Sequence, residues 1–325
     1  MTQEVVTYVE AIRKALATAL SEDERVVVLG EDVGFGGGAF RATEGLQAEF
    51  GEHRVIDTPI SEAAFTGAAV GMALDGMRPV VEFQFSDFLT SGMNAIVNTA
   101  AKMHFRHRVE VPIVIRAPAA GGFAGGPFHS QNPEAWFLRT PGLKVVCPAT
   151  AEDAGLLLGA AIADPNPVMF FEQKSLYTRI KGNFVYDSAA PLSGAAVRRA
   201  GADVTLVSYG AALHLSLEAA ELVAAEGIDV EVIDLRVLCP LDFESVATSV
   251  TKTSRCLIVH EDYSEYGVGA ELAARLADEL FECLDAPICR VGAFFWPIPF
   301  SPPLEAATLP NLDRIVEAVR RVATY

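Results

Sequence analysis

The sequence predicts an α/β protein with two parallel-sheet domains. Short, wholly apolar runs such as Val26–Leu29, which are typical of buried parallel strands, alternate with amphipathic helical segments from end to end. A chain of 325 residues, 51% of them hydrophobic, is long enough to bury more than one core. The alternation breaks once, between about Gln173 and Ala200, where charged residues, glycine and asparagine replace the apolar periodicity. We therefore predict a first domain over residues 1–180, a linker over residues 181–197 and a second domain over residues 198–325.

The first domain is predicted to open with a helix that reaches about Leu20 and whose start is marked by Thr7 and Glu10, the two polar residues of a capping box. Further helices are expected at about Ser61–Leu74, at Asp87–Phe105 and from Ala151. The predicted strands are Val26–Leu29, Val55–Asp57, Pro79–Phe85, Pro112–Arg116, Leu143–Cys147 and Val168–Phe171. A glycine-rich loop, Ala119–Pro127, follows the fourth of them.

The second domain repeats the alternation after the linker. Its predicted strands are Val204–Ser208, Val230–Asp234, Cys256–His260 and Ile288–Val291. Its predicted helices lie near Leu213–Glu226, Asp242–Val250, Ala270–Phe281 and Leu312–Val322.

Composition excludes several classes of function. A formal net charge of −17 repels nucleic acid and anionic membranes, so neither is an expected partner. No apolar run is long enough for a membrane span, and the high hydrophobic content favours burial in an oligomer. The five cysteines form no CxxC pair or zinc-type spacing and are interpreted as buried thiols. The first residues show no targeting signal, so we expect a cytoplasmic protein, or one of the mitochondrial matrix if the chain is processed.

A first candidate motif is the glycine-rich segment around Gly34, Gly36 and Ala39, which fits the dinucleotide-binding fingerprint. The context is wrong for that function, because the preceding strand ends at Leu29 and Glu31 and Asp32 would repel a pyrophosphate. We interpret the segment as a flexible active-site or interface loop.

Two ionisable residues lie at sequence positions that favour a catalytic role. Glu62 falls in the first turn of a predicted helix, after a strand and a Thr-Pro turn, among apolar neighbours that favour a perturbed pKa. His129 lies in the glycine-rich loop that follows a strand, where open α/β sheets place their ligands. A histidine there is suited to acid–base work, although spacing alone does not separate this role from an ordinary loop histidine.

Taken together, the motifs resemble the beta subunit of the decarboxylase component of 2-oxo-acid dehydrogenases. The resemblance covers essentially the whole chain in order. The matching stretches are Leu29–Val33, Asp57–Glu62, Glu82–Phe88, His129–Ala135, Pro141–Val146, Asp164–Pro167, Phe171–Lys174 and Pro302–Glu305. The resemblance implies a pyrimidine-binding domain of thiamine-diphosphate enzymes followed by a transketolase-type C-terminal domain.

The resemblance also implies roles for individual residues. Glu62 matches the glutamate that hydrogen-bonds the aminopyrimidine ring of thiamine diphosphate and stabilises the tautomer that activates the cofactor. His129 matches the histidine that supports reductive acylation of a lipoyl group. Ile60, Gln84 and Phe88 match positions lining the pyrimidine pocket, with Phe88 in place of a frequent tyrosine, so that its hydroxyl is missing.

A structural potassium site is implied as well. The matching residues, which contribute mostly backbone carbonyls, are Ile113, Ala161, Ile162, Asp164 and Asn166. Oxygen-only ligation suits a hard cation.

An absent motif indicates the partners. Thiamine enzymes hold the diphosphate and magnesium with a motif that begins Gly-Asp-Gly, and no Gly-Asp-Gly occurs in this sequence. The resemblance therefore implies an alpha subunit that carries the diphosphate and most of the magnesium ligation, in an alpha2-beta2 heterotetramer. It also implies docking of the C-terminal domain to the subunit-binding domain of a dihydrolipoyl acyltransferase core, with which the acidic balance is compatible.

The expected reaction is oxidative decarboxylation of a small 2-oxo acid. The stretches His129–Ala135 and Phe171–Lys174 look closer to branched-chain members than to bacterial pyruvate members, which slightly favours a branched-chain substrate. Alternatives are an acetoin dehydrogenase beta subunit, a non-catalytic scaffold subunit, a nicotinamide-dependent dehydrogenase that uses the Gly34 loop, and a self-sufficient transketolase-like enzyme. Intact Glu62 and His129 disfavour the scaffold, and chain length and the missing diphosphate motif disfavour the last.

Overall fold

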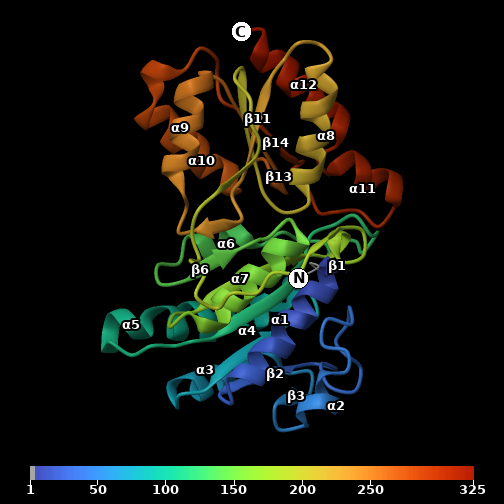
Figure 1. The fold of residues 1–325 in the computed structure, drawn as a ribbon, viewed down its shortest axis with the longest axis vertical. Helices are drawn as coiled ribbons and strands as arrows, with labels where there is room; N and C mark the ends of the chain where they lie inside the picture. The colour runs from blue at the N-terminus through green and yellow to red at the C-terminus, as the bar shows by residue number, and fades with distance from the viewer. Residues whose placement is uncertain (1–3) are drawn as a thin grey trace. The chain divides into compact units, whose positions relative to one another are not determined.

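The computed structural model describes residues 4–325 and confirms the α/β class with mainly parallel sheets. The chain forms two compact units (Figure 1). The first comprises the residues up to Ala119 together with Trp136–Leu192, and the second comprises Ala120–Ala135 together with Ser193–Tyr325. The glycine-rich loop that carries His129 thus clusters with the second unit. Met1–Gln3, part of the segment inspected for a targeting signal, lie outside the described residues.

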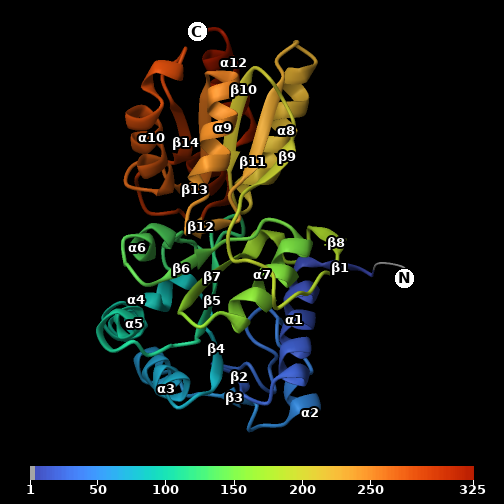
Figure 2. The same cartoon turned by 60° about the vertical axis from the view of Figure 1, so that its left-hand side comes forward.

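The first unit is built on parallel strands in the order β6-β7-β5-β4-β2-β3. The strands are β2 (Val26–Gly30), β3 (Val55–Asp57), β4 (Arg78–Glu82), β5 (Val114–Ala119), β6 (Lys144–Val146) and β7 (Val168–Gln173). The helices are α1 (Tyr8–Glu22), α2 (Leu46–Phe50), α3 (Glu62–Leu74), α4 (Leu89–Asn94), α5 (Ala101–His107) and α7 (Ala151–Ala163), and α6 (Glu134–Leu138) crosses the boundary between the units. Helices α1 and α7 lie on one face of the sheet, and α3, α4 and α5 lie on the other (Figure 2).

The start of α1 is set by the predicted capping box. The Glu10 N–H donates to the Thr7 hydroxyl oxygen at 3.3 Å, and the Glu10 carboxylate accepts the Thr7 N–H at 2.7 Å. These two bonds satisfy backbone donors that the first turn of a helix leaves without intrahelical partners.

The long helix predicted over Asp87–Phe105 is helical but not uniform. It begins with a 3₁₀ turn at Ser86–Phe88, continues as α4, contains a π-helical stretch at Ala95–Ala100 and ends as α5. Gly92 sits in its first half, where a Cβ atom would lie 2.9 Å from both the Phe83 ring and the Thr66 hydroxyl oxygen. The close approach of this helix to its neighbours therefore requires glycine at that position.

The predicted linker contains short strands that are too brief to show periodicity. Strand β8 (Lys181–Asn183) pairs antiparallel with β1 (Val5–Thr7), and β9 (Ala196–Arg199) pairs antiparallel with β11 (Val230–Asp234). The segment predicted as a linker thus contains short strands at its two ends.

The second unit has the strand order β14-β13-β10-β11-β9, parallel except for β9. Its other strands are β10 (Val204–Ser208), β12 (Val237–Cys239), β13 (Cys256–Tyr263) and β14 (Cys289–Ala293). Its helices are α8 (Ala212–Ala224), α9 (Phe243–Thr253), α10 (Val268–Glu279), α11 (Pro302–Thr308) and α12 (Leu312–Ala323). Helices α8 and α12 cover one face of the sheet, and α9 and α10 cover the other (Figure 1). The sequence did not predict α11, since seven residues opened by two prolines show no helical period.

No helix within residues 4–325 is both long and apolar enough to cross a membrane.

The core of the first unit contains a buried ionic network centred on Arg116. This fully buried side chain donates from Nε to Glu172 at 2.6 Å and from a terminal nitrogen to the other Glu172 oxygen at 2.9 Å. Its second terminal nitrogen donates to Glu82, the residue that lies opposite Arg116 in the pairing of β4 with β5. The Tyr177 hydroxyl completes the network by donating to Glu172 at 2.7 Å. Each charge is buried, so each depends on the others for its partners.

We expect Arg116→Met to destabilise the first unit by about 3–5 kcal/mol, because it leaves Glu82 and Glu172 buried without their cation. Urea unfolding followed by circular dichroism measures the loss. Arg25→Met, at an exposed ion pair with Asp23, serves as the control and should leave the midpoint nearly unchanged. Equal midpoints for both variants would show that the network contributes nothing to stability.

Candidate active site

The candidate site of the first unit lies at the carboxyl ends of three adjacent strands. Glu31 follows β2, Gln84 lies two residues beyond β4, and Glu62 begins α3 after the short turn that leaves β3. In parallel sheets these ends lie along one edge, which is where open α/β sheets bind ligands. The strand order therefore brings together residues that are far apart in sequence.

Glu62 is the first residue of α3 and is partly buried. The apolar enclosure that the sequence predicted around it is not formed within residues 4–325. The Ile60 side chain is 83% exposed, and Ala63 and Ala64 are also exposed. Of the apolar neighbours in sequence only Phe65 is buried, because apolar neighbours in sequence can point away from a side chain as well as around it.

Glu31 is a second acidic residue at this edge, and no catalytic role was predicted for it from the sequence. Its side chain is almost completely buried, and its Oε1 makes no hydrogen bond within the part of the chain that the structure describes. Burial, together with the negative charges of Glu62 and Asp32, raises the pKa of Glu31, while the Ser61 backbone N–H opposes the rise. The motif Leu29-Gly-Glu-Asp-Val contained the only sequence signal for this residue.

Gln84 and Phe88 are held by local contacts. The Gln84 side-chain amide donates to the Asp32 carboxylate at 3.1 Å. The Phe88 ring packs edge-on against Phe85, with ring centroids 5.7 Å apart, and Phe85 in turn contacts Phe40 at 5.5 Å. The predicted pocket residues Ile60, Gln84 and Phe88 thus belong to the same unit as Glu62 and follow the ends of neighbouring strands.

The Gly34 segment packs tightly against this edge. The Gly34 N–H donates to Asp57 at 2.6 Å, and a Cβ atom on Gly38 would lie 2.3 Å from a Glu82 carboxylate oxygen. Gly38 also has a φ of +79°, which favours glycine. No helix begins at Ala39, and the next one, α2, starts at Leu46. The glycines therefore serve close packing, and the strand–turn–helix context of a dinucleotide site is missing.

His129 lies in the second unit, in the loop that follows β5. The loop is closed at its base by a hydrogen bond from the Ala120 N–H to the Gln131 carbonyl at 3.1 Å. The Glu305 carboxylate accepts the Gly122 N–H at 3.0 Å and the Ala124 N–H at 2.9 Å. Glu305 is the last residue of one of the sequence motifs, but nothing in the sequence indicated that it contacts this loop.

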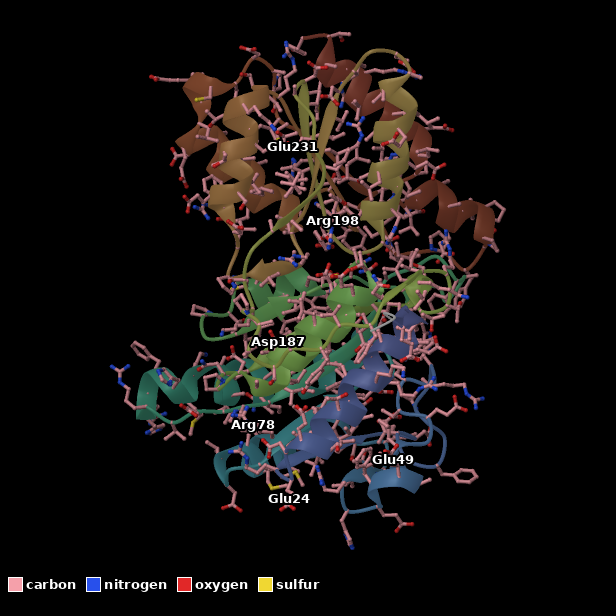
Figure 3. All side chains as sticks on the ribbon, viewed as in Figure 1. Glu24, Glu49, Arg78, Asp187, Arg198 and Glu231 are labelled. Atoms are coloured by element: carbon pink, nitrogen blue, oxygen red, sulfur yellow. The ribbon has the colours of Figure 1, made fainter. Side chains whose placement is uncertain are left out.

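The residues expected to hold potassium gather at the C-terminal end of α7 and beside β5. The Arg78 guanidinium, labelled in Figure 3, donates to the Ile162 carbonyl at 2.7 Å and to the Asp164 carbonyl at 3.3 Å. The Ile113 carbonyl accepts the Val168 N–H at 2.9 Å. The donor set of Ile113, Ala161, Ile162, Asp164 and Asn166 fits a hard cation in its chemistry, and Arg78 already supplies positive charge to two of its oxygens.

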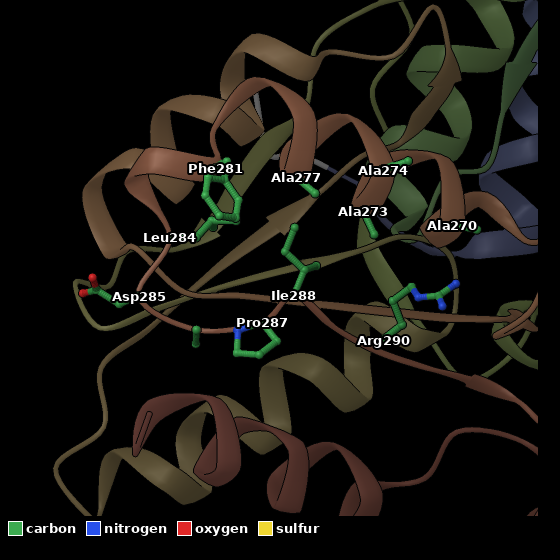
Figure 4. A pocket seen from close by; sticks show the side chains of 11 residues that line it. Ala270, Ala273, Ala274, Ala277, Phe281, Leu284, Asp285, Pro287, Ile288 and Arg290 are labelled. Atoms are coloured by element: carbon green, nitrogen blue, oxygen red, sulfur yellow. The ribbon is translucent and has the colours of Figure 1, made fainter.

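A groove of about 800 Å³ opens in the second unit between α10 and the edge strand β14 (Figure 4). Its walls are mostly alanine and other apolar side chains from α10 and the residues before β14, with Asp285 and Arg290 at the rim. The groove contains none of the candidate catalytic residues, so its volume does not identify it as the active site.

The raised pKa of Glu31 predicts a pH-dependent effect of Glu31→Gln on the isolated chain. Because the folded state disfavours the ionised carboxylate, native stability is lost as the pH rises through the raised pKa. The variant should therefore melt at a higher temperature than the wild type at pH 7, and the difference should vanish below the ordinary pKa of 4.5. Thermal melts across this range measure it, with exposed Glu24→Gln as the control (Figure 3). A difference independent of pH would rule out ionisation of Glu31 as its cause.

Comparison with known proteins identifies both halves of the chain. Residues 4–179 match the family model of the transketolase pyrimidine-binding domain, and residues 193–315 match that of the transketolase C-terminal domain. A solved structure described as a split-gene transketolase, inactive beta4 tetramer, shares the fold with a TM-score of 0.80 at 24% identity, covering 98% of each chain.

Curated relatives are similar over nearly their full lengths. The beta subunit of 2-oxoisovalerate dehydrogenase from Bacillus subtilis is 43% identical, with 99% of each chain covered. The beta subunit of 3-methyl-2-oxobutanoate dehydrogenase from Mycobacterium tuberculosis is 44% identical, covering 97% of this chain and 91% of that protein. The beta subunit of the pyruvate dehydrogenase E1 component from Leifsonia xyli is 43% identical, covering 98% and 94%. The chain therefore belongs to the thiamine-diphosphate-dependent family of E1 beta subunits of 2-oxo-acid dehydrogenases.

Proposed function

We propose that this chain forms, with an alpha subunit, the decarboxylase component of a 2-oxo-acid dehydrogenase complex, and that Glu62 is its cofactor-activating residue. The observation that carries the proposal is the placement of Glu62, Glu31 and Gln84 at the carboxyl ends of adjacent strands. The family matches over both domains agree with it.

The residues at this edge fit the pyrimidine half of thiamine diphosphate. Glu62 offers a carboxylate, Ile60 and Phe88 offer apolar surface, and Gln84 offers an amide. The cofactor, when bound, supplies the electron sink for decarboxylation. Glu62 would hold and release a proton at its carboxyl oxygen, against a ring nitrogen of the pyrimidine. Burial, together with the negative charges of Glu62 and Asp32, raises the pKa of Glu31, so Glu31 holds its proton more strongly than an ordinary glutamate does.

The open face of α3 supports the need for an alpha subunit. Besides Ile60, the exposed positions at the start of the helix are small, and Cβ atoms added at Gly67 and Gly71 would meet no atom within 4 Å. The sequence also lacks the Gly-Asp-Gly motif that begins a diphosphate site. The alpha subunit would therefore cover this face and carry the diphosphate and magnesium, in an alpha2-beta2 heterotetramer.

The remaining assignments complete the proposal. His129 would support reductive acylation of a lipoyl group on a dihydrolipoyl acyltransferase, whose subunit-binding domain docks on the C-terminal domain. A potassium ion, held by the carbonyl cluster beside Arg78, would have a structural role. The location would be cytoplasmic, or the mitochondrial matrix; the name of a relative from Oryza sativa includes the word mitochondrial.

A branched-chain 2-oxo acid is the favoured substrate, over pyruvate. Overall identity does not decide between them, since the relatives named for the two substrates are equally similar at 43%. The preference rests on the stretches His129–Ala135 and Phe171–Lys174.

We expect Glu62→Gln to lower decarboxylation by about 10²- to 10⁴-fold, because the amide cannot exchange the proton. The assay combines the chain with its co-purified alpha partner, thiamine diphosphate, magnesium and an artificial electron acceptor. It compares kcat/KM for 3-methyl-2-oxobutanoate, pyruvate and acetoin. Glu24→Gln, at an exposed position before β2, is the matched control. Turnover by the chain alone would refute the half-site proposal, and full activity of Glu62→Gln would refute the role of Glu62.

We expect His129→Gln to retain most decarboxylation with an artificial acceptor and to lose about 10²-fold or more in transfer to a lipoyl domain. The two half-reactions are measured on the same heterotetramer. His53→Gln, at an exposed histidine elsewhere in the chain, is the control. Normal lipoyl transfer by His129→Gln would remove His129 from the acyl-transfer step.

A further inference from the structure

Glu305 is a buried carboxylate whose hydrogen bonds lead to the loop that carries His129. It lies on α11 and is only 5% exposed. Its two oxygens accept the N–H groups of Gly122 and Ala124, one each. These are charge-assisted bonds to a negative acceptor, which are stronger than bonds between neutral groups.

The loop needs such a restraint because its backbone is strained. Gly122 has a φ of +86°, which glycine adopts readily, whereas Ala120 and Ala124 have side chains and still have φ values of +73° and +59°. A residue other than glycine in the left-handed region persists only where its surroundings enforce it. The N–H groups that Glu305 accepts belong to Gly122 and Ala124.

The loop also lies close to the segment that precedes α11. A Cβ atom on Gly121 would come within 3.1 Å of a Glu305 oxygen, and one on Gly126 would come within 2.5 Å of the Phe300 ring. The loop glycines thus allow both the carboxylate and the aromatic ring to approach the backbone.

Helix α11 is itself fixed, so it offers Glu305 a rigid support. The Trp296 indole donates to the Thr308 hydroxyl at 3.0 Å, and the Phe294 N–H donates to the Thr308 carbonyl at 3.1 Å. Leu309, just after the helix, packs in a buried cluster with Ala293 and Ile298. Residues 294–300, an aromatic segment that precedes α11, therefore anchor the helix.

We propose that Glu305 is a positioning residue for acyl transfer, which holds the glycine-rich loop in the conformation that presents His129. This inference rests on the proposed role of His129. It gives the C-terminal domain a direct part in the second half-reaction, with Glu305 acting through the loop backbone and not on substrate.

Glu305→Gln tests the proposal with little change in volume. The amide oxygen can accept only one of the two N–H groups, and its NH₂ group opposes the other. In the heterotetramer we expect lipoyl transfer to fall by about 10- to 100-fold, the cost of a small misplacement of a catalytic group. Decarboxylation with an artificial acceptor should stay within about twofold, since that half-reaction does not need His129. Glu317→Gln, at an exposed glutamate of α12, is the control.

Hydrogen exchange of the peptide that covers the loop gives a readout besides activity. The amides of Gly122 and Ala124 should exchange faster in Glu305→Gln, while peptides from β10 and β13 stay protected. Glu305→Asp, which keeps the charge on a shorter side chain, should recover part of both transfer and protection.

The outcomes separate this inference from the function on which it rests. If His129→Gln transfers acyl groups normally, the proposed role of His129 fails first. If His129→Gln loses transfer but Glu305→Gln retains it, the positioning role is overturned. An equal loss of decarboxylation and transfer in Glu305→Gln also overturns it, because it would show a general structural defect. A selective loss of transfer with faster loop exchange supports it.

Discussion

The buried ion network of Arg116 is the constraint on which the first unit depends. One guanidinium joins Glu82 on β4 to Glu172 on β7, and β5 carries it between them. Buried charges without partners are very costly, so a shift in strand register would be strongly disfavoured. Glu82 also lies against Gly38 and stands two residues before Gln84. The same network therefore fixes the sheet and the end of β4, from which the chain continues to Gln84.

The candidate cofactor site has two features that are unfavourable in the chain alone. Glu62 lies close enough to Glu31 for its charge to raise the pKa of Glu31. The face beside them exposes Ile60 and two glycines of α3, Gly67 and Gly71, where an added Cβ would meet no atom within 4 Å. Both features lower the stability of the chain by itself. In the proposed function both would become useful, because a second chain would cover the face and Glu62 would hold a proton against the pyrimidine ring. An incomplete site of this kind is what the proposed half-site function requires.

The His129 loop is held in a different way, by hydrogen bonds from its backbone to a buried carboxylate. Its backbone, which is strained at Ala124, is held by a carboxylate of α11 that lies 183 residues from Gly122 in sequence. Loops that carry catalytic groups gain precision when rigid elements support them. Here the support comes from α11 and the aromatic segment that anchors it. The aromatic residues thus fill a structural role at the loop, which composition alone did not reveal.

The sequence by itself determined the alternating α/β order, the capping box at Thr7 and the position of Glu62 at the start of α3, because periodicity and capping are local properties. The family motifs in the sequence also indicated the pyrimidine-binding and C-terminal domains, which the family models match. The sequence could not show that Glu31 lies beside Glu62, that Ile60 is exposed, or that Arg78 reaches the Ile162 carbonyl at the end of α7. Short elements such as β8 and α11 were not predicted, because they span too few residues to show a hydrophobic periodicity. Only the tertiary structure decided these contacts, since strand order and packing determine which distant side chains share a site.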